Sequence, residues 1–414
     1  MRPTIAQLPG SKIREVANAG LGRPDVLPFW FGESDEVTPL AVRQAAADAL
    51  LRGETFYSHN LGLAELREAL RHYTAGLHGD PGPDRIAVTS SGVTALMTAM
   101  QLLLDAGDEV VVVVPVWPNL PAQPAILGAR VRRVALAPDV TGAWRLDLDR
   151  LIAAVTPQTR VLLLNAPNNP TGWTLTRAEQ QALLDHCRRT GTWIVADEVY
   201  DRVWFGADAV ARVEVVEPGR IAEPGRVAAP SFGFAEPGRV AAPSFLDIAS
   251  PDDRLVVVHS FSKSFLMTGW RLGWLVLPRG QLDAVGKLIE FNSSCAPVFV
   301  QRGGLAALAM ADDFVPGLIA RLKAGRDALC PALAALPGVQ VARPMGGMYA
   351  FFRVPGAADS LAFAKRLVVE HGLGLAPGAA FGDEGEGWLR WCFASQDTAR
   401  LALGVDRLRD ALRL

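Results

Sequence analysis

Residues 260–271 combine an amine, hydroxyl groups and a guanidinium in one short run. Ser260, Ser262, Lys263 and Arg271 follow the apolar segment 255–258, which is typical of a buried strand. A lysine at the carboxyl end of such a strand is partly desolvated, which lowers its pKa and makes it a usable amine at neutral pH. Hydroxyl groups and an arginine suit a phosphate group. The run indicates a Schiff-base lysine that holds a phosphorylated aldehyde, and a solvated lysine beside a serine-capped turn is the alternative.

Two further strand ends carry candidate ligands for such a group. Ser91, Gly92 and Val93 open an apolar helix after the expected strand at 85–88. Unpaired N–H groups at a helix start bind phosphate, although an ordinary helix cap has the same sequence. Trp117 follows the next strand, where it can stack on a flat heteroaromatic ring or fill the core.

Polar residues also follow the expected strands at 160–164 and 193–196. Asn169 belongs to a dense turn signal, Asn-Ala-Pro-Asn-Asn-Pro-Thr-Gly, and its amide can hydrogen-bond a ring oxygen. Asp197 leaves an apolar strand, and a buried carboxylate needs a positive partner. A protonated pyridine nitrogen would supply that partner, whereas a helix cap is the alternative role.

Taken together, these motifs and their order along the chain resemble those of class I/II aminotransferases. This family belongs to the pyridoxal-5′-phosphate-dependent fold type I group, the aspartate aminotransferase superfamily. The similarity rests on S-x-S-K-x-x-x-x-x-G-x-R, N-N-P-T-G, D-E-x-Y and a late arginine, and it extends from Gly32 to Arg390. It implies pyridoxal 5′-phosphate as the cofactor, with an amino acid and a 2-oxo acid as substrates.

The resemblance also implies roles for individual residues. Lys263 would tether the cofactor and move the substrate's proton, Asp197 would pair with the pyridine nitrogen, and Tyr200 would contact the phenolic oxygen of the ring; these three are the expected catalytic residues. The implied cofactor-binding residues are Ser91, Gly92, Val93, Trp117, Asn169, Asp197, Tyr200, Ser260, Lys263, Arg271 and Tyr57.

Substrate binding and assembly are implied in the same way. Arg390 matches the arginine that binds the substrate's α-carboxylate, with Gly32 and Asn169 beside it. Tyr57 matches a residue that reaches into the neighbouring subunit's site, so a homodimer is expected. The chain departs from the family at residues 32–35, where the usual G-E-P-D reads Gly-Glu-Ser-Asp, and a glutamate follows. We therefore expect the entrance for the substrate to differ from that of the family.

The elements that must position these residues follow from the apolar pattern. Short apolar runs alternate with amphipathic segments between residues 85 and 277, which is typical of a mostly parallel sheet covered by helices. A capping box at 176–179 predicts a helix that ends at Gly191. We expect an α/β fold, with a large domain built on a mostly parallel seven-stranded sheet and a smaller α+β domain formed by both chain ends. The expected strands are 85–88, 109–114, 131–136, 160–164, 193–196, 255–258 and 273–277.

The expected division of the chain is an N-terminal arm with part of the small domain at 1–44, the cofactor-binding domain at 45–290 and the small C-terminal domain at 291–414. A duplication interrupts the large domain, because residues 222–232 recur unchanged as 235–245. Pro-Gly pairs in each copy disfavour helix and strand, so we interpret about 215–247 as a duplicated surface loop. An active-site lid is the alternative.

Composition narrows the class of protein. Half of the 414 residues are hydrophobic and a fifth are charged, which favours a globular enzyme. The 41 basic and 43 acidic residues nearly cancel, so a nucleic acid or an anionic membrane is not an expected partner. The four cysteines lie apart from one another and from metal-ligand spacing, so no metal site is expected. No signal-peptide core or membrane span is evident, which favours the cytoplasm.

The sequence therefore predicts an amino-acid aminotransferase that works by ping-pong transfer, with 2-oxoglutarate as the acceptor. A lyase, decarboxylase or synthase that uses the same cofactor is the first alternative, because small changes around the cofactor redirect its chemistry. A non-catalytic sensor of the cofactor or of an amino acid is the second. Aspartate, alanine, aromatic and branched donors all remain open.

Overall fold

The computed structural model of the chain describes residues 1–206 and 241–412. Within these ranges, seven strands form a sheet in the order β2-β10-β9-β8-β7-β3-β4. Neighbouring strands are parallel, except that β10 is antiparallel to both β9 and β2. This arrangement confirms the expected mostly parallel seven-stranded sheet. The strands are β2 (Ile86–Thr89), β3 (Glu109–Val114), β4 (Arg130–Ala135), β7 (Thr159–Asn165), β8 (Trp193–Asp197), β9 (Leu255–Ser260) and β10 (Gly273–Val276).

The middle residues of the central strands are apolar because helices cover both faces of the sheet. In β3, Val110 and Val112 pack on one side of the sheet, and Val111 and Val113 pack on the other. Helices α5, α6 and α9 cover the first face, while α4, α7, α8 and α10 cover the second. Their bounds are α4 (Ala64–His78), α5 (Gly92–Leu103), α6 (Asn119–Leu127), α7 (Leu148–Ala154), α8 (Arg177–Thr190), α9 (Leu282–Ser293) and α10 (Val298–Ala309).

The polar ends of the strands meet at one edge of the sheet. β7 and β8 end in register, with Asn165 opposite Asp197. Because β10 runs the other way, its first residue, Gly273, lies opposite Ser260 at the end of β9 and Thr89 at the end of β2. The edge therefore collects residues that lie far apart in the sequence, which is where open α/β sheets place ligand sites.

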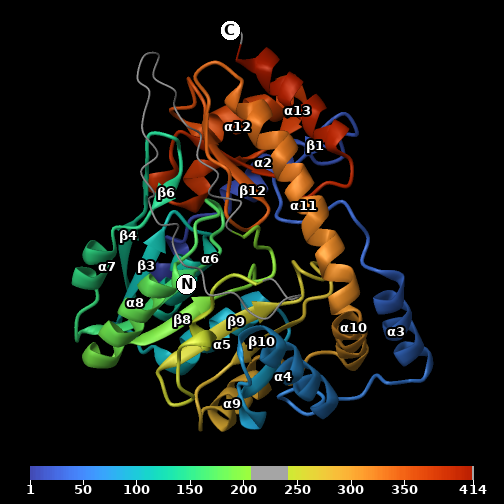
Figure 1. The fold of residues 1–414 in the computed structure, drawn as a ribbon, viewed down its shortest axis with the longest axis vertical. Helices are drawn as coiled ribbons and strands as arrows, with labels where there is room; N and C mark the ends of the chain where they lie inside the picture. Colours follow the sequence, from blue (N-terminus) through green and yellow to red (C-terminus); the bar gives the residue numbers. More distant parts are fainter. Residues whose placement is uncertain (207–240, 413–414) are drawn as a thin grey trace, which may run out of the picture.

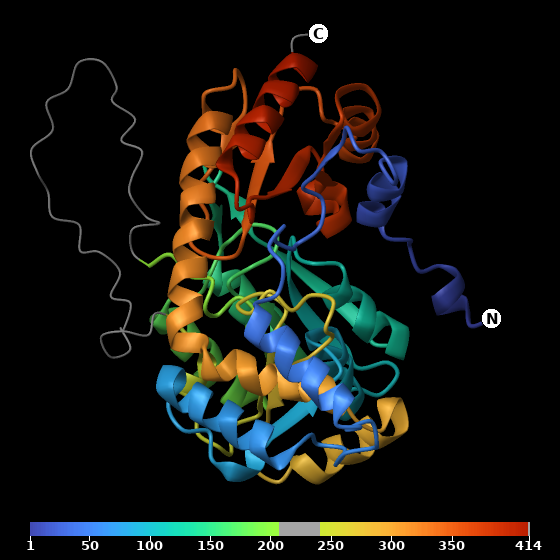
Figure 2. The ribbon, with the colours of Figure 1, turned by 90° about the vertical axis from the view of Figure 1, so that its right-hand side faces the viewer.

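A smaller α and β part lies beyond this edge, in the upper half of Figure 1. Its antiparallel strands follow the order β11-β12-β15-β14. β1 pairs in parallel with β13, and α2 packs on α12, so both chain ends build this part. Figure 2 shows the long helix α11 running beside both parts. The bounds are α2 (Lys12–Ala19), α11 (Ala311–Ala334), α12 (Ser360–His371), α13 (Thr398–Ala411), β1 (Leu27–Pro28), β11 (Gln340–Val341), β12 (Tyr349–Arg353), β13 (Leu373–Gly374), β14 (Ala376–Pro377) and β15 (Trp388–Cys392).

The local predictions that fall on described residues are confirmed. Each expected strand of the large sheet is present, within two residues at either end. In α8 the side chain of Thr176 accepts a hydrogen bond from the backbone N–H of Glu179, the Glu179 carboxylate accepts one in return, and Gly191 ends the helix with a φ of 74°. Most of the duplicated segment at 215–247 lies outside the described residues. In the described ranges, the remaining α-helices and strands are α1 (Pro3–Ala6), α3 (Leu40–Leu51) and the short pair β5 (Ala137–Pro138) and β6 (Trp144–Arg145).

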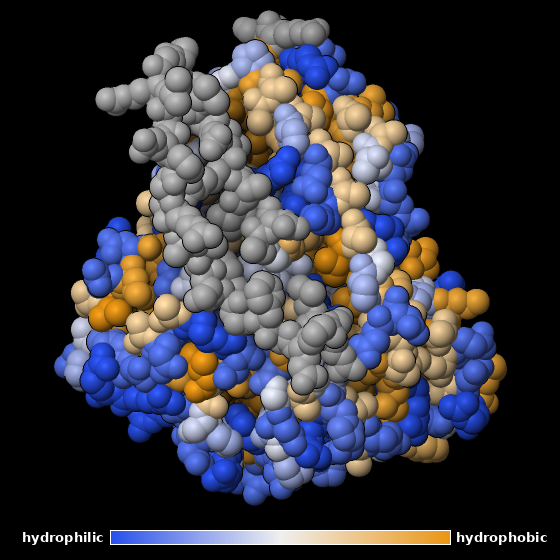
Figure 3. Space-filling model, in the orientation of Figure 1, coloured by the Kyte–Doolittle hydropathy of each residue, from blue (hydrophilic) through white to orange (hydrophobic). Residues whose placement is uncertain are grey.

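The surface shown in Figure 3 carries many hydrophilic residues, with smaller hydrophobic groups between them. In the ranges that the structure describes, no helix has both the length and the apolar character needed to cross a membrane.

Candidate active site

A cavity of about 370 Å³ lies at the edge where the strands of the large sheet end. Its walls come from these strand ends, from β12 and β15 of the smaller part, and from α2. The fold therefore brings both chain ends to one site. Eleven residues predicted from the sequence line this cavity: Gly32, Gly92, Val93, Trp117, Asn169, Asp197, Tyr200, Ser260, Lys263, Arg271 and Arg390.

Lys263 lies in the turn that follows β9, and its amine is held inside the cavity. Its Nζ donates a 2.6 Å hydrogen bond to the carbonyl oxygen of Gly32 and lies 5.6 Å from the centre of the Tyr200 ring. Burial lowers the pKa of Lys263 to about 8, and the positive charge of Arg390 acts in the same direction. About a tenth of the amine is therefore uncharged at pH 7, far more than in an ordinary lysine, and is able to attack an aldehyde.

Asp197 is the last residue of β8, and its carboxyl group is buried. Its Oδ1 accepts a 3.4 Å hydrogen bond from the backbone N–H of Val199, while the side chain of Asn165 donates to its backbone carbonyl at 3.1 Å. Burial raises the pKa of Asp197 to about 7. A turn follows it rather than a helix, so it is not a helix cap. A cation placed against this carboxylate would favour its ionised form.

The start of α5 forms one wall of the cavity. Gly92 and Val93 are its first residues, and N–H groups in the first turn of a helix have no acceptor within the helix. The Ser91 hydroxyl accepts a 3.0 Å hydrogen bond from the backbone N–H of Thr94, so this side chain caps the helix. The helix start thus leaves backbone donors toward the cavity, a common arrangement for binding anions.

Ser260 and Arg271 line the same cavity as the start of α5. A Cβ atom on Gly92 would lie 2.9 Å from the Cβ of Ser260, so the glycine permits this close approach. The Arg271 guanidinium donates to the carbonyl oxygen of Thr268 at 2.6 Å, and burial lowers its pKa. Together, backbone N–H groups, a hydroxyl and a guanidinium make a donor set that matches a phosphate.

Arg390, on β15, is fixed on several sides. Its guanidinium donates to Asn169 Oδ1 at 2.9 Å and to the carbonyl oxygen of Trp30, and it lies 4.4 Å and 4.8 Å from the ring centres of Tyr349 and Phe381. Among the described residues, its buried Nε has no hydrogen-bond partner. A buried donor of this kind needs an acceptor, and an anion in the cavity would supply one.

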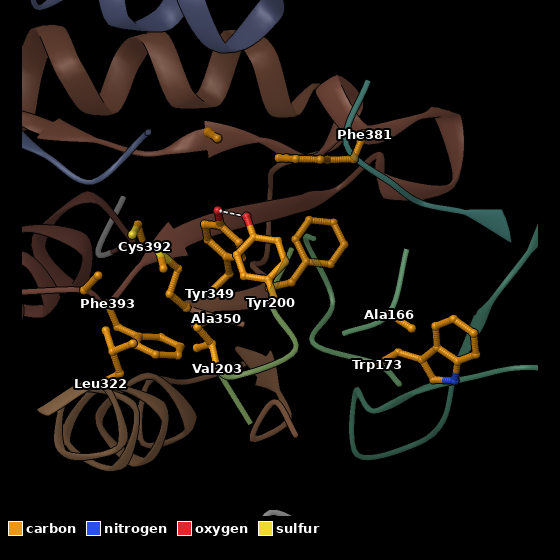
Figure 4. Close-up of a cluster of buried hydrophobic side chains, with 14 of the residues drawn as sticks. Ala166, Trp173, Tyr200, Val203, Leu322, Tyr349, Ala350, Phe381, Cys392 and Phe393 are labelled. Carbon is orange, nitrogen blue, oxygen red and sulfur yellow. Dashed lines mark hydrogen bonds between the residues drawn. The ribbon is translucent and has the colours of Figure 1, made fainter. Parts of the chain in front are cut away.

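The remaining predicted residues differ in placement. Tyr200 is buried, and its hydroxyl lies 2.6 Å from the hydroxyl of Tyr349 (Figure 4). Trp117 lines the cavity, and its backbone N–H donates to the carbonyl oxygen of Asn169 at 2.8 Å. Tyr57, by contrast, lies outside the cavity of its own chain and is 89% exposed.

Several lining residues were missed from the sequence, among them Arg14, Phe31, Glu33, Asn165 and Tyr349. Asn165 opens the same turn signal that contains Asn169, so that signal could have identified it. Glu33 stands next to the predicted Gly32. Arg14 and Tyr349 come from α2 and β12, and their local sequences carry no comparable signal.

The chain is similar to known aminotransferases over nearly its full length. The profile of the family described as aminotransferase class I and II matches residues 25–408. The chain is 30% identical to an aspartate aminotransferase of Thermotoga maritima over 413 residues, which covers 99% of this chain and 98% of the relative. It is also 30% identical to an arginine–pyruvate transaminase of Pseudomonas aeruginosa over 391 residues, which covers 94% and 88%. The crystal structure of the Thermotoga maritima aspartate aminotransferase superposes with a TM-score of 0.84 at 29% identity over the full length of both chains.

The residues present fit the cofactor of that family, pyridoxal 5′-phosphate. The cavity offers an amine of lowered pKa for its aldehyde, a buried carboxylate that needs a cation and a donor set for its phosphate. The orphaned Nε of Arg390 leaves a donor for a substrate anion. Sequence, fold and site therefore place this chain in the aminotransferase class I and II family, as a pyridoxal-5′-phosphate-dependent aminotransferase.

Proposed function

We propose that this aminotransferase moves the amino group of an L-amino acid to 2-oxoglutarate in two half-reactions at one site. The observation that carries the proposal is the meeting of Lys263, Asp197 and Arg390 in a single cavity beside the phosphate-matching donor set. Because both substrates would use the same carboxylate site, they bind in turn. The expected kinetics are therefore ping-pong.

Lys263 has two proposed tasks, as covalent tether of the cofactor and as general base. When bound, the cofactor accepts the electron pair that stays behind as the substrate's Cα loses its proton. The Nζ of Lys263 would receive that proton and later return it. A pKa of about 8 suits a group that must both take up and return a proton near neutral pH.

Asp197 is proposed to keep the ring nitrogen of the cofactor protonated. Its buried carboxylate would form an ion pair with that nitrogen, and such a pair favours the charged form of both partners. Tyr200 and Asn169 are proposed to hydrogen-bond the phenolic oxygen at the other side of the ring, with Trp117 stacked on its face. These contacts would hold the ring in one orientation relative to Lys263.

Arg390 is proposed to bind the substrate's α-carboxylate. Its planar fork can hold a carboxylate through two hydrogen bonds, which fixes the substrate's orientation as well as its position. Hydrogen bonds and two aromatic rings already immobilise the guanidinium, so little ordering remains to be done when substrate binds. Gly32 would lie beside the same carboxylate.

A cofactor-conversion assay tests the proposed reaction. Each of the twenty amino acids is mixed with the loaded protein, and both pyridoxamine 5′-phosphate and the released oxo acid are quantified. Transamination predicts equal amounts of both products, followed by recovery of the starting cofactor with 2-oxoglutarate. Release of carbon dioxide or ammonia without the matching oxo acid would contradict the proposal. Aspartate, arginine and aromatic donors come first, because relatives carry these substrates in their names.

We also propose that the chain forms a homodimer in which Tyr57 contributes to the partner's site. The support is the exposure of large apolar side chains: Phe56 is 83%, Tyr57 is 89% and Phe291 is 87% exposed. Exposed aromatic residues of this size are typical of surfaces that contact a partner. The resemblance to the family implies that Tyr57 reaches into the neighbouring subunit's site and binds the cofactor there.

A hybrid dimer tests this assembly. Tyr57→Ala and Lys263→Ala chains, each of low activity alone, are co-expressed with different tags and the hybrid is purified. If Tyr57 acts across the interface, the Tyr57→Ala chain keeps its lysine and receives an intact tyrosine from its partner, so one site per dimer is restored. A hybrid no more active than the mean of the two parents, or a monomer in sedimentation, would contradict the proposal.

We also propose domain boundaries at residues 44 and 290 and a cytoplasmic location, as expected from the amino-acid sequence. The pairing of β1 with β13 supports a small domain that contains both chain ends. Limited proteolysis followed by mass spectrometry tests the boundaries. Because residue 44 falls in α3 and residue 290 in α9, cleavage between domains is expected in the connections beside these helices.

A further inference from the structure

Tyr349 contacts three parts of the site at once, although no motif of the sequence marks it. It is the first residue of β12, it lines the cavity, and only 1% of its surface is exposed. Tyrosine is rare in this chain, which contains four. Two of the four, Tyr200 and Tyr349, meet in this cavity (Figure 4).

The first contact joins two hydroxyl groups. The hydroxyl oxygens of Tyr349 and Tyr200 lie 2.6 Å apart, with ring centres separated by 5.8 Å and ring planes inclined at 78°. Burial raises the pKa of Tyr349 to about 12 and that of Tyr200 well above its usual value, so both phenols stay protonated at neutral pH. One O–H lies between the two oxygens, and the other is free for a third group. For Tyr200 to donate toward the cofactor, Tyr349 must donate to Tyr200.

The second contact involves the face of the ring. Phe351 lies opposite Arg390 in the β12–β15 pair, so Tyr349, two residues earlier, is a diagonal neighbour of Arg390 on the same face of this sheet. The guanidinium carbon of Arg390 lies 4.4 Å from the centre of the Tyr349 ring. This distance is typical of a cation–π interaction, and the buried setting strengthens it.

The third contact explains a glycine. A Cβ atom on Gly32 would lie 2.0 Å from the hydroxyl oxygen of Tyr349 and 3.0 Å from its Cζ. A side chain at position 32 would therefore displace the hydroxyl from Tyr200. The carbonyl oxygen of Gly32 also accepts the hydrogen bond from Lys263, so the same displacement would reach the reactive amine.

We propose that Tyr349 is a positioning residue with two separable tasks: its hydroxyl orients Tyr200 toward the cofactor, and its ring holds Arg390 for the substrate's carboxylate. The inference rests on the proposed roles of Tyr200 and Arg390. It predicts that removing the hydroxyl alone affects the cofactor, whereas removing the ring also weakens substrate binding.

The hydroxyl task is tested by Tyr349→Phe, with Tyr73→Phe as the matched control. Tyr73 is also buried, but it does not line the cavity, and its hydroxyl accepts a 3.2 Å hydrogen bond from Arg202. The readout is the pH midpoint of the visible absorption band of the resting, cofactor-loaded protein. A weaker donor at the phenolic oxygen favours the protonated form, so Tyr349→Phe should raise the midpoint by about 0.3–1 pH unit, and Tyr73→Phe should leave it unchanged. An unchanged midpoint in Tyr349→Phe would overturn the hydroxyl task.

The ring task is tested by comparing Tyr349→Phe with Tyr349→Leu, using the best donor from the amino-acid screen. Phenylalanine keeps the ring under Arg390, so its KM should stay within about twofold of the unchanged protein. Leucine removes the ring, and KM should rise about tenfold, which corresponds to the loss of one buried cation–π contact. An equal rise in both variants, or no rise in Tyr349→Leu, would overturn the ring task.

A thermal double-mutant cycle tests the geometry without any turnover. In the cofactor-free protein, Gly32→Ala should lower Tm more in the presence of Tyr349 than in the Tyr349→Phe background, where the nearest atom is 3.0 Å away instead of 2.0 Å. Additive losses would contradict the close packing of these two residues. Because neither this cycle nor the absorption midpoint depends on amino transfer, a failure of the proposed reaction is distinguishable from a failure of the inference.

Discussion

Replacing Arg390 by lysine keeps a positive charge in the cavity but removes the planar fork. The arginine donates to Asn169 and to the backbone of Trp30, and it leaves Nε for a ligand. A lysine can offer the substrate's carboxylate one direct hydrogen bond in place of two, and each charge-assisted bond is worth about 1.5–3 kcal/mol. Loss of the contacts that the Arg390 guanidinium makes with the rings of Tyr349 and Phe381 adds about 1 kcal/mol.

The sum, about 3 kcal/mol, corresponds to a loss of about 10²-fold in kcat/KM, since each 1.36 kcal/mol is tenfold. The assay is the rate of cofactor conversion over a range of donor concentrations, compared for Arg390→Lys and for Arg353→Lys, an exposed arginine on the same sheet. The control should retain its rate. A loss below about fivefold in Arg390→Lys, with unaltered cofactor binding, would refute the assignment of the carboxylate site.

Three other changes have defined outcomes. Cofactor-free protein should react with pyridoxal 5′-phosphate faster as the pH rises through about 8, because the lowered pKa of Lys263 sets the fraction of reactive amine. Stopped-flow absorbance measures this rate, and a rate that does not change with pH would argue against Lys263 as the reacting amine. Asp197→Asn should lower kcat by about 10²–10³-fold, with partial recovery when the protein is loaded with a cofactor methylated at its ring nitrogen, and full activity in the variant would contradict the ion pair. Deletion of residues 222–234, one copy of the duplicated unit, should change cofactor affinity and kcat by less than about twofold, whereas a large loss of kcat would favour the lid.

Much of the large sheet could be predicted because its signals are local. A strand such as β3, with five consecutive valines, is recognisable from its own residues once both faces of the sheet are buried. The start of α8 is equally local, since the bonds between Thr176 and Glu179 span one turn. Residues at the ends of such strands were therefore placed at the correct edge before their partners were known.

The contacts of the site from the smaller part could not be predicted in this way. Tyr349 meets Tyr200 across 149 positions of sequence, and neither residue's neighbours specify that pairing. The role of the Ser91 side chain could not be predicted for a different reason: a helix cap and a phosphate ligand have the same sequence. In the structure the Ser91 hydroxyl caps the helix. Tyr57 is a third case: it is 89% exposed, and the site proposed for it would belong to another copy of the chain.

Lys263 is the residue expected to hold the cofactor covalently, and borohydride reduction followed by peptide mass spectrometry tests this assignment. The loaded protein should carry one reduced cofactor adduct, on the peptide that contains Lys263. Lys263→Ala should carry none and should remain folded, while Lys287→Ala, a change at an exposed lysine on α9, should label like the unchanged protein. An adduct on any other lysine, or one that persists in Lys263→Ala, would contradict the account.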